Sequence, residues 1–256
     1  LWLHLMDAHT PYILKNKHIK ELNINSKKLT RNPQKYVNKR HKCPEFVIDS
    51  YDAAIRSVDE QIRRFMEVVS KETIAIITAD HGEEFGEQKD FHTASVYQNM
   101  AKVPLIIKGL NKQKQGNVQH LDILPTILGM KGIDLPDNLD GIDLSSDKNL
   151  DDRTILLGIT NDEDEKEEVA LVKNNYKIVW HCQQNKFYLY NIEKDGDEEN
   201  NISKNKPQLF DEMKEEMRNI ATNMENKKIE TKPNTISKND EEEIKKKLEE
   251  LGYKKE

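Results

Sequence analysis

An apolar run that ends in a carboxylate and an imidazole constrains this chain more than any other feature. Residues 73–78 are apolar enough to form a buried strand, and Asp80, His81 and Gly82 follow almost directly. Open α/β sheets bind their ligands at the carboxyl ends of strands. Aspartate oxygen and histidine nitrogen together suit a divalent metal ion, and Gly82 would let the backbone turn away sharply. The alternative is a strand followed by an ordinary polar turn, which Asp-His-Gly alone does not exclude.

Strand-like and helical patterns alternate along the first 144 residues. The strand-like segments are continuously apolar, as expected of strands that are buried on both faces. Residues 15–44 are polar and basic, which indicates a long excursion or lid. We therefore predict an α/β fold with a mostly parallel sheet and helices on both faces. The expected strands are residues 1–6, 73–79 and 103–108, and the expected helices are residues 48–69 and 118–130, the second of them stopped by Gly132.

The sequence changes character after Leu144. Short strand patterns separated by polar turns predict a small antiparallel sheet, with Asn174-Asn175 as a hairpin turn, closing against a helix at about 207–224. The composition of residues 225–239 favours a mobile segment, and a short charged helix is expected at 240–251. The expected strands are residues 154–159, 169–173, 176–180 and 187–190. The predicted parts are thus residues 1–145, 146–224 and 225–256.

Charge and cysteine content exclude several classes of function. The net charge of −6 combines 40 basic and 46 acidic residues and gives no electrostatic case for binding nucleic acid. No apolar run approaches the roughly 20 residues that span a bilayer. Cys43 and Cys182 are too few for a disulfide framework or a cysteine zinc site, and they fit a reducing compartment, which slightly favours the cytoplasm. The oligomeric state stays open.

Further segments match, in order, those of one enzyme family. Together they resemble the later half of the sulfatases, which belong to the alkaline phosphatase superfamily, and the resemblance runs nearly end to end. It implies that fold, with a small C-terminal subdomain. The matching segments are Asp7-x-His9-x-Pro11-Tyr12, the helix at 51–62, Asp80-His81-Gly82-Glu83, residues 92–97 and 103–107, Asp122-x-x-Pro125-Thr126, Leu139-Asp140-Gly141, and Leu189-Tyr190-Asn191-Ile192 with Asp195.

The resemblance implies roles for four residues. Asp80 and His81 would be metal ligands. Many sulfatases have Asn in place of His81, so calcium is favoured but manganese, magnesium and zinc are alternatives. His92 lies where the family has a Lys or His that binds the transferring anion. His9 lies where a histidine contacts the sulfate and can protonate the leaving alcohol. The alternatives are an exposed loop histidine for His92 and a hydrogen-bonded histidine at a strand end for His9.

Neighbouring residues receive lesser roles. We interpret His4, Asp7, Glu83 and Glu84 as supporting residues, Trp2 and Trp180 as core residues, and we assign no role to His41, His120 and His181.

Part of the sulfatase pattern is not found in the sequence. Sulfatases carry a Cys/Ser-x-Pro/Ala-x-Arg signature, whose Cys or Ser becomes the formylglycine nucleophile, and an Asp-Asp pair near the N-terminus that completes the metal site. Neither is present before His9. Cys43-Pro44-Glu45-Phe46 has neither the spacing nor the arginine. We therefore interpret the chain as the C-terminal part of a longer sulfate-ester hydrolase, inactive by itself. The alternatives on the same fold are a phosphodiesterase, a phosphonate monoester hydrolase, a phosphoethanolamine transferase or a non-catalytic remnant.

Overall fold

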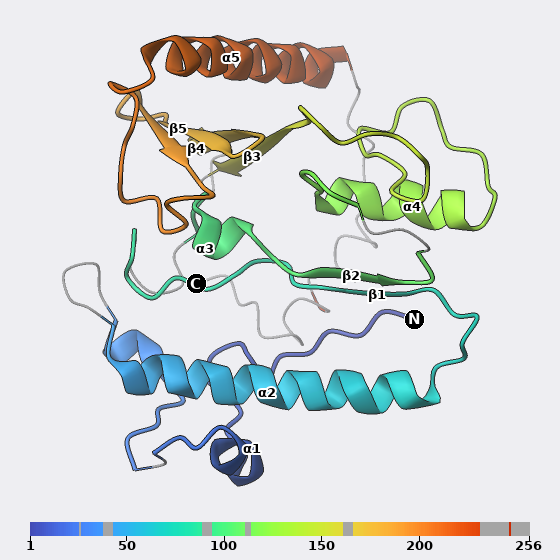
Figure 1. Ribbon diagram of the computed structural model, residues 1–256, viewed down its shortest axis with the longest axis vertical. Helices are drawn as coiled ribbons and strands as arrows, with labels where there is room; N and C mark the ends of the chain where they lie inside the picture. The colour runs from blue at the N-terminus through green and yellow to red at the C-terminus, as the bar shows by residue number, and fades with distance from the viewer. Residues whose placement is uncertain are drawn as a thin grey trace. The chain divides into compact units, whose positions relative to one another are not determined.

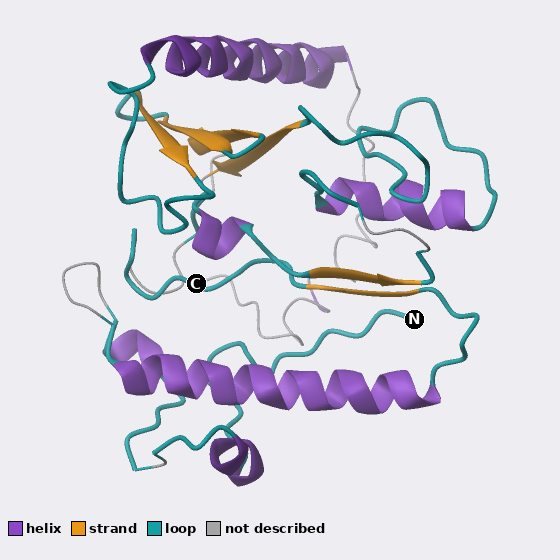
Figure 2. Ribbon diagram, in the orientation of Figure 1, coloured by secondary structure: helices purple, strands orange, loops and turns teal. Residues whose placement is uncertain are grey.

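The computed structural model describes residues 1–25, 27–37, 43–88, 94–110, 114–160, 166–230 and 246. The chain divides into two compact units, Leu1–Lys214 and Glu215–Glu256. Every helix and strand before α5 (Pro207–Glu230) belongs to the first unit, and α5 continues from the first unit into the second (Figures 1 and 2). None of the described helices is both long and apolar enough to cross a bilayer.

The 24-residue helix α2 (Glu45–Val68) confirms the helix expected at residues 48–69. Its buried face differs from the apolar stripe in the sequence, because Ile48 and Ile55 are each 42% exposed. The face that is buried carries small side chains, which allow neighbouring segments to approach the helix closely. These residues are Val47, Ser50, Ala53, Ala54 and Ser57.

The strand expected at residues 1–6 does not form. The segment is irregular, and no described strand pairs with it, so its backbone lacks the hydrogen-bonded neighbour that a strand requires. Trp2 is 88% exposed, so its interpretation as a core residue is also wrong. The residue after this segment contacts α2: Ser57 Oγ donates to Asp7 Oδ1 at 2.8 Å.

The polar excursion at residues 15–44 contains structure that its composition does not predict. A short helix, α1 (Asn16–Glu21), is followed by the 3-10 turn η1 (Pro33–Lys35). The fully buried His18 ring lies between two carboxylates, with Nδ1 3.2 Å from Glu21 and Nε2 3.2 Å from Glu60 on α2. The contacts of His18 and Lys17 with Glu60 attach α1 to α2.

The mostly parallel sheet expected from the sequence is not seen among the described strands. β1 (Ala75–Thr78) and β2 (Leu105–Lys108) pair antiparallel in a two-stranded sheet. A parallel crossover needs a connection of about a dozen residues or more, which is usually a helix that returns the chain along the first strand. The described helix between them, α3 (Gln98–Ala101), has only four residues. Beyond β1, the Gly82 amide donates to the Met100 carbonyl at 2.8 Å, which continues the antiparallel approach of the two segments.

Two motifs of the sequence meet around a buried carboxylate. The 3-10 turn η2 (His120–Asp122) leads into α4 (Ile123–Met130), as predicted for residues 118–130, and Gly132 follows with φ of +65°. Asp122 is fully buried and binds Arg153 through two hydrogen bonds of 2.6 and 2.7 Å. Its Oδ1 also accepts the Ile142 amide at 2.8 Å. The Asp-x-x-Pro-Thr and Leu-Asp-Gly motifs therefore build one structural joint.

The small C-terminal antiparallel sheet is confirmed. Its strands pair in the order β3-β4-β5-β6, every pair antiparallel, and Asn174 takes φ of +52° in the predicted hairpin turn. At the start of α5, Lys214 Nζ lies 4.5 Å from the centre of the Phe187 ring on β6. The strands are β3 (Thr154–Thr160), β4 (Lys166–Lys173), β5 (Tyr176–His181) and β6 (Lys186–Asn191).

The helix expected at about 207–224 is α5, which extends to Glu230. The first residues of the segment expected to be mobile, 225–230, are therefore helical. Residues 231–239 and the helix expected at 240–251 lie outside the described residues, apart from residue 246.

Candidate functional site

Asp80 and His81 lie in the turn that follows β1, as the sequence predicts. Asp80 Oδ1 accepts the His81 amide at 3.0 Å, while His81 Nδ1 lies 2.8 Å from the Gly82 carbonyl. Because a carbonyl only accepts, we assign the proton of a neutral His81 to Nδ1. The second ring nitrogen, Nε2, then carries the lone pair and lies 3.9 Å from Asp80 Oδ2.

This donor pair fits one divalent ion. Ligand atoms about 2.0 to 2.6 Å from a shared ion lie roughly 3 to 4 Å apart, which agrees with the 3.9 Å between Nε2 and Oδ2. A hydrogen bond from the other ring nitrogen to a backbone carbonyl is typical of metal-binding histidines. Within the described part of the chain, no group of three or more His, Cys, Asp and Glu side chains could hold an ion. Asp80 and His81 could therefore supply two donors to an ion, which alone would not complete a coordination sphere.

Gly82 is required by a close approach of two backbones, not by the sharp turn expected from the sequence. Its amide donates to the Met100 carbonyl at 2.8 Å, and the Glu83 amide donates to the Asn99 carbonyl at 3.0 Å. A Cβ atom at position 82 would lie 1.8 Å from the Asn99 oxygen. Gly82 is not among the glycines with positive φ. The carbonyl end of α3 thus holds the turn that presents Asp80.

Three aromatic rings connect the segment after His9 with the turn after β1. The centres of the Tyr12 and Tyr51 rings are 5.7 Å apart, and those of Tyr51 and Phe85 are 5.2 Å apart. Burial raises the pKa of both tyrosines, that of Tyr51 to about 12, and the Glu83 carboxylate raises both pKa values further. The structure therefore links Tyr12 to Glu83 and Phe85 beside Tyr51 of α2, although these residues are far apart in the sequence.

Of the two predicted catalytic histidines, His9 is among the residues that the structure describes and His92 is not. His9 Nδ1 lies 2.7 Å from the Thr10 carbonyl, so Nδ1 is the donor there and Nε2 is the nitrogen suited to exchanging a proton with a substrate. His92 lies outside the described residues. Its role remains a prediction from the sequence.

Several other residues singled out in the sequence have defined contacts. Glu84 is fully buried and its Oε1 accepts the Gln88 amide at 2.6 Å, consistent with a supporting role. His120 Nε2 lies 3.1 Å from Thr78 Oγ1 at the end of β1. Trp180 is half-buried and stacks on Phe187, with ring centres 5.4 Å apart. His41 lies outside the described residues.

His181 lies between two side chains. Its Nδ1 is 3.2 Å from Glu168 Oε1, and its Nε2 is 3.1 Å from the Tyr97 hydroxyl. The sequence alone points to neither Tyr51 nor these buried polar partners, because each contact joins segments that are distant in the chain.

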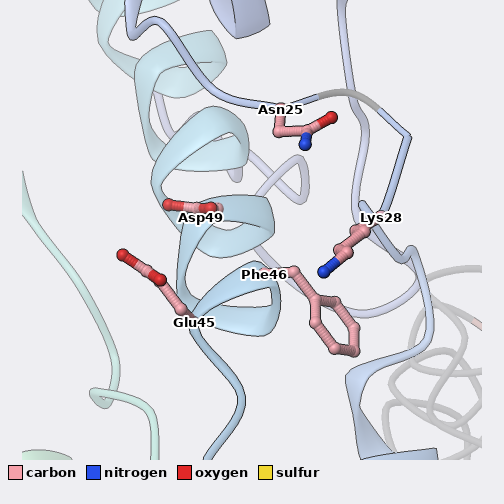
Figure 3. Close-up of a pocket in the computed structure, with 5 residues that line it drawn as sticks. All are labelled: Asn25, Lys28, Glu45, Phe46 and Asp49. Carbon is pink, nitrogen blue, oxygen red and sulfur yellow. The ribbon is translucent and has the colours of Figure 1, made fainter.

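A separate pocket of about 270 Å³ lies at the start of α2 (Figure 3). In Figure 3, Glu45 and Asp49 project to one side of the helix, and Phe46 and Lys28 lie toward the other. Charges of both signs line it, and none of its residues is a predicted site residue. Its lining residues are Asn25, Lys28, Glu45, Phe46 and Asp49.

Two family models and several known proteins match this chain. The Sulfatase family model matches residues 1–133, and the model described as N-sulphoglucosamine sulphohydrolase, C-terminal, matches residues 86–227. An arylsulfatase of Clostridium perfringens (strain 13 / Type A) is 28% identical over 169 residues, which cover 60% of this chain and 35% of that protein.

Solved structures share the fold. The sulfatase-assigned protein yidJ of Bacteroides fragilis matches with a TM-score of 0.63 and 21% identity, covering 80% of this chain and 50% of that chain. The phosphonate monoester hydrolase of Agrobacterium radiobacter matches with a TM-score of 0.57 and 20% identity, covering 70% of this chain and 42% of that chain. The chain thus spans about half, or less, of the length of the relatives it matches.

Proposed function

The chain belongs to the sulfatase family, and from this membership we propose that it supplies the metal-binding and acid–base side of an active site that hydrolyses sulfate esters. The observation that most supports this proposal is the placement of Asp80 and His81 at the end of β1. Their oxygen and nitrogen donors are 3.9 Å apart, in a turn where both side chains are accessible to solvent. The aromatic contact between residues 12, 51 and 85 supports a shared site with His9.

Asp80 and His81 would hold one divalent ion. Calcium is favoured by the carboxylate, and manganese, magnesium or zinc are alternatives because of the nitrogen donor. Such an ion, when bound, supplies positive charge to the sulfate oxygens. The hydrogen bond from His81 Nδ1 to the Gly82 carbonyl would fix the ring with Nε2 directed at the ion.

His9 and His92 would serve the ester itself. When the sulfur–oxygen bond to the alcohol breaks, the leaving oxygen needs a proton, and His9 Nε2 would donate it while Nδ1 holds the Thr10 carbonyl. A cationic His92 would stabilise the charge that develops on the sulfate oxygens. The attacking group would be the formylglycine of the family signature, which these 256 residues do not contain.

Hydrolysis of an aryl sulfate tests the proposal, in a protein that contains this chain together with the nucleophile signature. Asp80→Ala should abolish metal-dependent turnover, since the site loses a charged ligand. His92→Ala should lower turnover by roughly 10² to 10³ while metal content stays near wild type. Asp59→Asn is the matched control, because Asp59 is an exposed carboxylate on α2 paired with Arg56.

The outcomes separate the alternatives. Full turnover by Asp80→Ala would overturn the metal assignment, and metal loss in His92→Ala would make His92 a ligand instead. Faster hydrolysis of an aryl phosphonate or a phosphodiester than of the aryl sulfate would favour phosphoryl chemistry on the same fold. No turnover of any of these esters would favour a non-catalytic remnant.

A further inference from the structure

A buried ion pair lies in the small C-terminal sheet. Lys177 on β5 is fully buried, Glu198 is 1% exposed, and Lys177 Nζ lies 2.9 Å from Glu198 Oε1. Burial lowers the pKa of Lys177 and raises that of Glu198, and the attraction between the two charges opposes both shifts. Packed apolar side chains generally stabilise a fold as well as a buried ion pair does. The stability of the sheet therefore does not explain the pair.

Glu198 uses its second carboxylate oxygen to hold α3. Its Oε2 accepts the amide of Gln98, the first residue of that helix, at 2.5 Å. Its backbone carbonyl accepts Gln88 Nε2 at 2.9 Å. The Glu198 backbone has φ of +54°, a left-handed conformation that disfavours side chains other than glycine. A charged residue is thus held in an unfavourable conformation at the point where two segments attach to the sheet.

The opposite end of α3 holds the Asp80–His81 turn. The Asn99 and Met100 carbonyls, which have no partner within such a short helix, accept the amides of Glu83 and Gly82. A four-residue helix has little stability of its own, so its position depends on the contacts at its two ends. Tyr97, the residue before α3, also packs in the core of the sheet. Its neighbours there are Val96, Ala170, Val179 and Tyr190.

We propose that Glu198 and Lys177 are positioning residues for the Asp80–His81 turn. The Glu198 carboxylate fixes the amide end of α3, and the carbonyl end of α3 fixes Gly82 and Glu83. Lys177 Nζ, 2.9 Å from Glu198 Oε1, holds the buried carboxylate in this orientation. The effect of these contacts on metal binding rests on the proposed function. The hydrogen-bonded connection from Glu198 through α3 to Gly82 does not.

Amide hydrogen exchange in the 256-residue chain tests the link. A single substitution would leave one buried charge unpaired and can prevent folding, so the pair is changed together. Lys177→Met with Glu198→Leu removes both charges and the acceptor. Lys177→Met with Glu198→Gln removes both charges but keeps an amide oxygen for Gln98. The matched control is Glu199→Gln, an exposed neighbouring carboxylate.

We call the double substitutions Lys177→Met with Glu198→Leu the Met/Leu variant, and Lys177→Met with Glu198→Gln the Met/Gln variant. In the Met/Leu variant, the Gly82 and Glu83 amides should exchange roughly 10- to 100-fold faster, as expected for losing a hydrogen bond to a charged group. The amides between β4 and β5 should keep their protection. The Met/Gln variant should recover most of the protection at Gly82 and Glu83, and the Glu199→Gln control should match wild type. Unchanged exchange at Gly82 and Glu83 would overturn the proposal. An equal loss of protection throughout β4 and β5 would overturn it too, because the pair would then only stabilise the sheet.

Mn²⁺ titration separates this proposal from the proposed function. If Asp80 and His81 bind the ion, the Met/Leu variant should bind Mn²⁺ about 10-fold more weakly than wild type, as for loss of a supporting contact. If wild type binds no Mn²⁺ there, the metal assignment fails. Faster exchange at Gly82 and Glu83 would still support the link. If Mn²⁺ binds equally well in wild type and variant, the positioning role is contradicted.

Discussion

At the scale of single residues, the site depends on a distance between two backbones. Gly82 lies so close to α3 that even one carbon atom on its Cα would overlap the Asn99 carbonyl, at 1.8 Å. At the same contact, the amides of Gly82 and Glu83, which follow Asp80 and His81, donate hydrogen bonds to carbonyls of α3. The geometry of Asp80 and His81 is thus tied to the absence of a side chain at the next position.

Gly82→Ala should therefore damage both stability and the site. The turn must move away from α3, at a cost of about 1 to 3 kcal/mol in the free energy of unfolding, as for overpacking elsewhere. Urea denaturation measures this cost. Gly196→Ala is the control, because a Cβ atom at position 196 would meet nothing within 4 Å. If the two variants are equally stable, the close approach is not the reason for Gly82.

At the scale of elements, the joint around Asp122 connects η2, α4 and the chain before β3. The buried carboxylate binds Arg153 through two hydrogen bonds and also the Ile142 amide. Gly141 is needed in the same joint, since a Cβ atom there would lie 1.9 Å from the Leu121 carbonyl oxygen. The motifs that resemble sulfatases at residues 121–128 and 139–141 are therefore structural.

Asp122→Ala should destabilise the fold by about 3 to 5 kcal/mol, because Arg153 would keep an uncompensated charge in a largely buried place. Denaturant unfolding checks the value. Asp134→Ala, which removes an exposed carboxylate, should change stability by less than about 0.5 kcal/mol. A cost near that of the control would mean that the joint does not depend on this ion pair.

Local patterns predict some elements well and others poorly, for identifiable reasons. The four strands after Leu144 have turn residues such as Asn174 between them, so their pairing is encoded in adjacent segments. The direction of β2 depends on how the chain returns from β1, which no local pattern shows. Residues 1–6 have strand composition, but a strand also requires a partner, and none of the described strands provides one.

The same distinction applies to the candidate site. Asp80 and His81 are neighbours in sequence, so their shared position at the end of a strand could be predicted. The contact of Tyr12 with Tyr51 and the bond from Gln98 to Glu198 join distant segments, and only the fold reveals them. The role of Gly82 also changes, because its backbone partner is in α3.

At the scale of the whole molecule, buried tyrosines limit stability at high pH. Burial raises the pKa of Tyr12, Tyr51, Tyr97 and Tyr190 above the usual value of 10.0, to about 12 for Tyr51 and Tyr190. A group with a raised pKa in the folded state contributes its full stability below its unfolded pKa and loses it as the pH rises. The free energy of unfolding should therefore fall as the pH rises from about 10 towards 12.

Urea denaturation at a series of pH values measures this fall. Tyr51→Phe should make it shallower, because one titrating group is removed while the ring contacts with Tyr12 and Phe85 are kept. A flat profile over this range would contradict the burial of these hydroxyls.

The proposed function depends on one claim, that Asp80 and His81 bind a divalent ion at the end of β1. Line broadening of amide NMR signals by Mn²⁺ tests it directly in the 256-residue chain, because it detects weak binding residue by residue. We predict that the signals of residues 79–83 broaden first. Asp80→Asn and His81→Ala should require at least about 10-fold more Mn²⁺, whereas the control Asp59→Asn should not differ from wild type. Broadening spread over exposed carboxylates, and unchanged by either substitution, would contradict the account.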